Sequence, residues 1–96
     1  MKITLSPQRR DDTLTVTKQA DVLIINGTEY DFTDLSDGGT LPADAVDSEY
    51  VIGSVDRVNG ELELTLLLPH GPNASEAARF PEPIMDPADG EVELPK

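Results

Sequence analysis

The chain has 96 residues, no cysteine and no tryptophan, and its 19 acidic and 7 basic side chains give a formal net charge of −12 at pH 7. This acidic net charge argues against direct binding to the phosphate backbone of nucleic acid or to an anionic membrane surface. The missing cysteines exclude disulfides, thiol catalysis and cysteine-based zinc sites. The length predicts one domain, residues 1–96, with a modest core of leucine, valine and isoleucine.

The first third of the chain predicts three antiparallel strands after a short strand over residues 2–5. Residues 13–18 alternate polar and apolar side chains, which is typical of a half-buried strand. A two-residue turn at Gln19-Ala20 leads into the next strand, residues 21–25. This register places Lys18 opposite Asp21, Val16 opposite Leu23, and Leu14 opposite Ile25.

Two Asn-Gly doublets are the strongest local signals in the chain. Asn26-Gly27 and Asn59-Gly60 lie between runs of β-type residues, and Asn-Gly suits the two positive φ angles of a type I′ hairpin turn. The first turn pairs Leu23 with Tyr30 and Asp21 with Phe32. Three strands then share one apolar face, made by Leu14, Val16, Leu23, Ile25, Tyr30 and Phe32, while Val22 and Ile24 lie on the other face.

The second doublet predicts a hairpin of residues 50–58 with residues 61–68. Its register places Asp56 opposite Glu63, Val55 opposite Leu64, Gly53 opposite Leu66 and Val51 opposite Leu68. The longest apolar stripe of the chain follows a period of two and consists of Leu62, Leu64, Leu66 and Leu68, which we expect to form the central core. Residues 34–47 before it predict a loop with one helical turn at residues 43–46.

The C-terminal part is rich in proline, with six of the eight prolines at positions 69, 72, 81, 83, 87 and 95. Asn73 as N-cap and Glu76 at the third position predict a short helix through Arg79. Residues 91–94 predict an edge strand. Together the patterns predict an all-β fold, a small antiparallel meander or sandwich of five to seven strands, with a hairpin core over residues 1–68 and a Pro-rich extension over residues 69–96.

No constellation of residues predicts chemistry. His70 is the only histidine, so it has no second histidine or cysteine to complete a transition-metal site. Asp31, Asp34 and Asp37 recur every third residue, whereas a calcium loop of the EF-hand type needs ligands at alternate positions and a glutamate at the twelfth. We therefore predict no catalytic residue, no cofactor-binding residue, no metal ligand and no enzymatic activity.

The middle of the chain is the most acidic part. Residues 29–63 contain ten acidic side chains and one basic side chain, Arg57. Two interpretations stay open: an acidic face that binds a basic partner or imitates nucleic acid, and a solvated surface that keeps a small aliphatic domain in solution. The Pro-rich extension is open to two interpretations as well, a peptide ligand for another protein or a strap over the sheet.

Three segments of the sequence resemble a known group of proteins, and this resemblance indicates a biological setting. The segments NGEL at residues 59–62, LLLPHGPNAS at 66–75 and RFPEPI at 79–84 resemble small acidic proteins that phages and prophages of Gram-negative bacteria encode among their tail genes. The resemblance implies a bacterial cytoplasmic location, or association with the virion, and a structural or assembly function through contacts with protein partners such as a tail component. The alternative function is an acidic decoy that binds a basic host DNA-binding protein.

Overall fold

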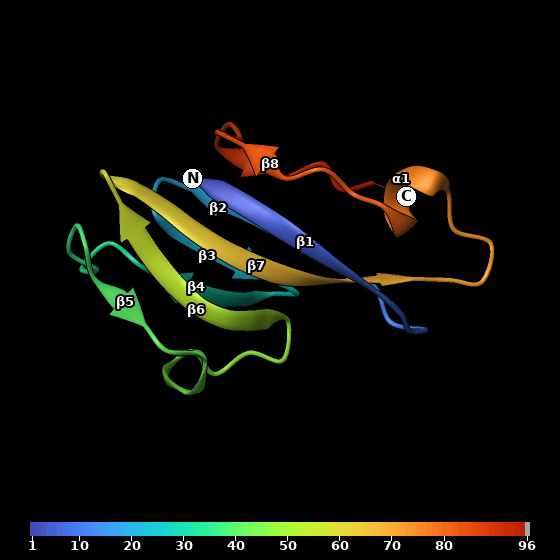
Figure 1. The fold of residues 1–96 in the computed structure, drawn as a ribbon, viewed down its shortest axis with the longest axis horizontal. Helices are drawn as coiled ribbons and strands as arrows, with labels where there is room; N and C mark the ends of the chain where they lie inside the picture. Colours follow the sequence, from blue (N-terminus) through green and yellow to red (C-terminus); the bar gives the residue numbers. More distant parts are fainter. Residues whose placement is uncertain (96) are drawn as a thin grey trace.

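The computed structural model describes residues 1–95, which form two β-sheets packed face to face (Figure 1). The all-β fold predicted from the sequence is confirmed. The elements in chain order are β1 (Lys2–Arg9), β2 (Val16–Gln19), β3 (Val22–Ile25), β4 (Thr28–Asp31), β5 (Thr40–Leu41), the 3-10 turn η1 (Ala43–Ala45), β6 (Val51–Val58), β7 (Glu61–His70), α1 (Glu76–Arg79), β8 (Ile84–Met85) and β9 (Gly90–Glu91). Six strands have at least four residues, and β5, β8 and β9 have two each.

The larger sheet has the strand order β5-β6-β7-β1-β8, and the smaller has the order β4-β3-β2-β9. β1 and β7 are parallel, with Lys2 opposite Glu63 and Arg9 opposite His70, and this one pair departs from the predicted antiparallel arrangement, which the other strand pairs follow. β1 is also longer than the predicted residues 2–5. β8 pairs only with the start of β1, so Pro7 lies where β1 is an edge strand, a position that tolerates proline.

The hairpin of β2 and β3 differs in register from the prediction. Its turn is Ala20-Asp21 instead of Gln19-Ala20, and Val16 lies opposite Ile25 while Lys18 lies opposite Leu23. Asp89 holds this turn from a distant part of the chain, because its carboxylate accepts hydrogen bonds from the backbone N–H of Ala20 at 3.0 Å and from the Lys18 ammonium at 2.7 Å. The shift is two residues, so the same side chains still face the core.

Both Asn-Gly turns have the predicted conformation. The φ angles are +48° and +83° at Asn26 and Gly27, and +52° and +80° at Asn59 and Gly60. The first turn sets Leu23 opposite Tyr30, as predicted, and the Phe32 N–H donates to the Asp21 carbonyl at 3.0 Å.

The second hairpin has the predicted register only near its turn. Asp56 lies opposite Glu63 as predicted, but Ile52 lies opposite Thr65 and Val51 opposite Leu66. Three residues of β6 therefore stand against Leu64 alone between these pairs, and the predicted partners of Gly53 and Val51 were wrong. Gly53 has a φ of +71° within this bulge, a conformation that glycine adopts at low cost.

The core lies between the sheets. The leucines of the predicted stripe are at most 3 % exposed, which confirms that the stripe lies at the centre of the core; they are Leu62, Leu64, Leu66 and Leu68. Strands of both sheets add Ile3, Leu5, Val16, Leu23, Ile25, Val51 and Val55 to this cluster, and segments outside the strands add Phe32, Val46 and Val92. Of the predicted apolar face, Leu14 and Tyr30 are partly buried at its margin.

The C-terminal part returns to both sheets, since β8 pairs with β1 and β9 pairs with β2. α1 begins two residues later than predicted: Ser75, not Asn73, is the N-cap, and its hydroxyl accepts the Ala78 N–H at 3.2 Å. The predicted edge strand over residues 91–94 is shorter and begins earlier, although the Val92 N–H still donates to the Val16 carbonyl. No helix in residues 1–95 is long and apolar enough to cross a membrane.

Candidate functional site

One end of the sandwich carries an apolar groove of about 360 Å³, which we call the end groove. Segments from four parts of the chain line it: Thr13 and Leu14; Leu68, Pro69, His70 and Gly71; Ala74 and Ala78; and Leu94 and Pro95. Figure 1 shows α1 close to the C-terminal end of the chain, and both contribute lining residues.

The strand β7 explains where the groove lies. Its core stripe ends at Leu68, and the next position of the same face is His70, so the lining continues the core toward the surface. The chain then turns at Gly71-Pro72 and comes back as α1, whose Ala78 is buried. Because α1 is short and contributes only the small side chain of Ala78 to the lining, space remains between it and Leu68.

Two further hollows, each of about 460 Å³, adjoin the end groove. The first shares Pro95 with it and is lined by Glu76, Ala77, Phe80 and Glu82. The second shares Leu14 and Leu94 with it and is lined by Thr15, Val16, Glu91, Val92 and Glu93. Phe80 is 73 % exposed, the most exposed of the large hydrophobic side chains in residues 1–95 that lie at the surface.

Carboxylates surround this surface. Glu76, Glu82, Glu91 and Glu93 are all exposed, and the ion pairs found among residues 1–95 include none of them. Arg79 is the one basic side chain on α1, and its guanidinium lies 5.9 Å from the centre of the Phe80 ring. The end groove therefore combines an apolar lining with a negatively charged margin.

A polar cluster lies next to the groove, where the Arg10 N–H donates to the His70 carbonyl at 3.1 Å. The Asp12 carboxylate accepts from the Tyr50 hydroxyl at 2.6 Å and pairs with the Arg10 guanidinium at 2.8 Å. The Tyr50 hydrogen bond lowers the pKa of Asp12, and the same bond raises the pKa of Tyr50. Each charge in the cluster is matched by a partner, so the cluster holds the loop after β1 in place.

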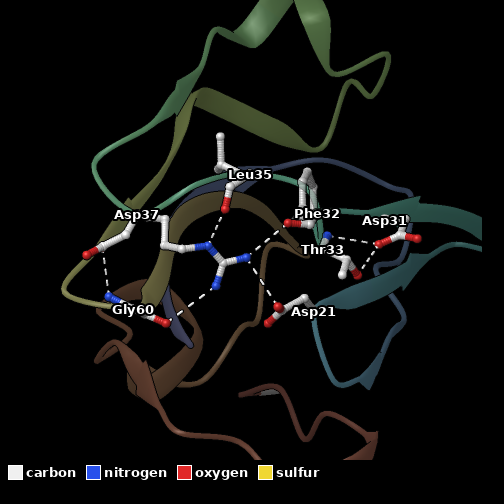
Figure 2. A network of polar contacts seen from close by, with 8 residues as sticks. Asp21, Asp31, Phe32, Thr33, Leu35, Asp37 and Gly60 are labelled. Carbon is white, nitrogen blue, oxygen red and sulfur yellow. Dashed lines mark hydrogen bonds and ion pairs between the residues drawn. The ribbon is translucent and has the colours of Figure 1, made fainter.

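A second polar network, around Arg57, joins the two sheets (Figure 2). The guanidinium donates to the Leu35 carbonyl, to the Phe32 carbonyl at 3.0 Å and to the Asp21 carboxylate at 3.2 Å. Its side chain is only 12 % exposed. All its partners belong to the protein backbone or to Asp21, so the network is structural.

Asp31 and Asp37, which the sequence analysis compared with a calcium loop, bind different backbone groups of the protein. The Asp31 carboxylate accepts from the Thr33 N–H and hydroxyl, which lowers the pKa of Asp31, and the Asp37 carboxylate accepts from the Gly60 N–H at 2.9 Å. Figure 2 shows Asp31 and Asp37 on opposite sides of the network. Within residues 1–95 no group of three or more histidine, aspartate or glutamate side chains is placed to hold a metal ion.

The sequence around Pro69-His70-Gly71-Pro72 predicts that His70 is a solvated turn residue, but His70 is the last residue of β7. It is half-buried in the lining of the end groove, and its Nδ1 lies 3.0 Å from the Gly71 carbonyl oxygen. The sequence analysis missed the groove itself. The signal that was available is Phe80, a large apolar residue within a polar, Pro-rich segment.

Comparisons of the chain with family models, with curated proteins and with solved structures found no match. The resemblance to phage tail-region proteins accordingly stays a prediction.

Proposed function

We propose that this chain is a non-enzymatic structural or assembly accessory protein of a phage or prophage, and that it acts through protein–protein contacts in the bacterial cytoplasm or on the virion. The observation that carries the proposal is the end groove, an apolar surface that is open to solvent and next to the exposed Phe80. Exposed apolar surface with a polar margin is typical of protein interaction sites. The phage setting rests on the resemblance of residues 59–84.

The groove has a mostly apolar lining, which favours contact with apolar side chains. Among residues 1–95, His70 is the one titratable residue of the lining, and its ring nitrogen contacts the backbone carbonyl of the next residue. A general base needs a substrate proton within hydrogen-bond reach and a partner that orients it. The proposal therefore assigns binding and not turnover to this surface.

The test is purification of the tagged chain from its native host after phage induction, with mass spectrometry of the proteins that co-purify. We expect tail components to be enriched over a tag-only control at 0.1 M salt and to be still enriched, in smaller amount, at 0.5 M, because salt screens the charges at the margin but not the apolar contacts. A result in which no virion component is enriched contradicts the proposal.

The acidic decoy is the competing outcome of the same experiment. It predicts a basic DNA-binding host protein that is retained at 0.1 M salt and lost at 0.5 M, because its affinity depends on charges that salt screens.

A further inference from the structure

We infer that the end groove, with its two flanking hollows, binds an extended peptide segment of a partner protein in which large apolar side chains are flanked by lysine or arginine. This inference rests on the proposed function, because it specifies the chemistry of the protein contact.

The apolar part of the segment follows from the lining. Leu14, Leu68 and Leu94 converge on the groove, and alanines line the side of α1. A volume of about 360 Å³ falls within the range of pockets that bury most of a ligand's surface, about 300–1,000 Å³. Large side chains in such a pocket dominate binding, as apolar anchors do at the centres of protein interfaces.

The two hollows beside the groove predict that the bound peptide is extended. The first hollow shares the lining residue Pro95 with the groove, and the second shares Leu14 and Leu94, so both hollows adjoin the groove. A compact ligand fills one of them, whereas a peptide chain reaches all three. In this arrangement Phe80 contacts one end of the peptide. Residues 91–94, which line the second hollow, contact the other end of the peptide.

The negatively charged margin of the groove predicts basic residues on either side of the peptide's apolar side chains. Glu76 and Glu82 line the first hollow, and Glu91 and Glu93 line the second, while Arg79 is the one basic side chain on α1. A second copy of this chain is a poor occupant, because each copy carries a net charge of −12. Lysine or arginine on either side of the apolar anchors meets a carboxylate pair at each end, which favours association and fixes the position of the peptide.

The first experiment uses three fluorescein-labelled ten-residue peptides. One has leucine and phenylalanine between two pairs of lysines, the second has glutamates in place of the lysines, and the third has serines in place of leucine and phenylalanine. Fluorescence anisotropy at 0.15 M salt should show saturable binding of the first peptide only. Equal binding of the glutamate or serine peptide would overturn the inference.

Amide chemical shifts of the ¹⁵N-labelled protein locate the site. The first peptide should shift the amides of the groove and its hollows, and leave those of β4 and β5 unchanged. A shift map centred anywhere else contradicts the inference.

Charge reversal with matched controls tests the margin. Glu82→Lys with Glu93→Lys should weaken binding of the first peptide about tenfold, since two exposed attractive pairs become repulsive. Glu29→Lys with Asp44→Lys changes the net charge by the same amount at exposed sites outside the groove, and should leave the affinity within about twofold. Equal loss in both double variants would show attraction by net charge alone and refute the site.

The apolar contact has its own pair of variants. Phe80→Ser should weaken peptide binding, whereas Val58→Ser, at another exposed apolar side chain, 46 % exposed and outside the groove, should not. Unchanged affinity in Phe80→Ser would remove Phe80 from the site.

The two proposals fail in different ways. If the wild-type chain retains tail components but none of the peptides binds, the groove inference is wrong and the proposed function stands. If the basic apolar peptide binds in the groove but the native host yields no virion component, the proposed function is wrong and the groove remains a peptide site.

Discussion

Arg57 Nη2 on β6 lies 3.2 Å from Asp21 Oδ2 in the turn between β2 and β3, so this ion pair connects the larger sheet to the smaller one. The same guanidinium donates to two backbone carbonyls in the segment that follows β4. Arg57 is the one basic residue in an acidic stretch, and its planar group with several donors suits this set of partners.

Arg57→Lys keeps the charge but removes the fork of donors. We expect the free energy of unfolding to fall by about 1–3 kcal/mol, because carbonyls in a poorly hydrated place lose charged partners. Urea denaturation measures this change. Arg9→Lys at an exposed position is the matched control, and we expect an effect below about 0.5 kcal/mol. Equal stability of the two variants would show that the network does not hold the sheets together.

The Asp12–Tyr50 hydrogen bond predicts a dependence on pH. The folded-state pKa of Asp12 lies below its ordinary value of 3.8, so this contribution to stability is present above that pH and is lost as the pH falls through the lowered value. The folded-state pKa of Tyr50 lies above its ordinary value of 10.0, so that contribution is complete below pH 10 and is lost as the pH rises further.

Tyr50→Phe tests this pair directly. It should raise the pKa of the Asp12 carboxyl group, measured by NMR titration, because the main group that lowers it is gone. The pKa of Asp31, which Thr33 lowers, is the internal control and should not move. An unchanged Asp12 pKa in the variant would contradict the hydrogen bond.

Gly60→Ala should lower the free energy of unfolding by at least about 1 kcal/mol. A Cβ at Gly60 meets no atom within 4 Å, so the cost comes from its φ of +80° and not from a clash. Gly71→Ala is the matched control, because its Cβ also enters open space but its φ is not in the positive region. We expect it to change stability by less than about 0.5 kcal/mol. Equal melting curves for the two variants would argue against a type I′ turn at Asn59-Gly60.

The features that the sequence predicted are local ones. Asn26-Gly27 and Asn59-Gly60 determine their own turns, and the period of two determines which leucines of residues 61–68 face the core. Gly53 shows where a local signal was overlooked, because an isolated glycine within a strand suggests a bulge. Its bulge separates the register near the turn from the register at Val51.

The features that the sequence did not predict depend on distant residues. The turn at Ala20-Asp21 is held by Asp89 and Arg57, which lie far along the chain. The parallel pairing of β1 with β7 likewise depends on how the two sheets bury their apolar faces, because no short turn connects these two strands. The end groove has lining residues from four separate segments, so no short pattern indicates it.

Substitutions at Ser75 and Asn73 distinguish the observed N-cap of α1, Ser75, from the predicted one, Asn73. Ser75→Ala should destabilise the protein by about 1 kcal/mol, because the Ala78 N–H loses the hydroxyl that accepts its hydrogen bond. Asn73→Ala should cost less than about 0.5 kcal/mol, since Asn73 is exposed and lies outside the helix. Thermal unfolding of both variants gives the comparison, and a larger loss for Asn73→Ala would restore Asn73 as the cap.

Leu64→Ala tests the stripe that joins the two sheets. Leu64 is 3 % exposed, lies opposite Ile3 of β1 and faces the bulge of β6, so its side chain is surrounded on both sides within the larger sheet. Truncation should lower the free energy of unfolding by about 2–5 kcal/mol, the sum of lost apolar burial and the cavity left behind. The total free energy of unfolding of a domain of this size is about 5–15 kcal/mol, so the melting temperature of the variant should fall steeply. Val58→Ala, at a 46 % exposed position of the same hairpin, is the control and should cost less than about 1 kcal/mol. If Leu64→Ala melts at the wild-type temperature, the stripe is not the centre of the core.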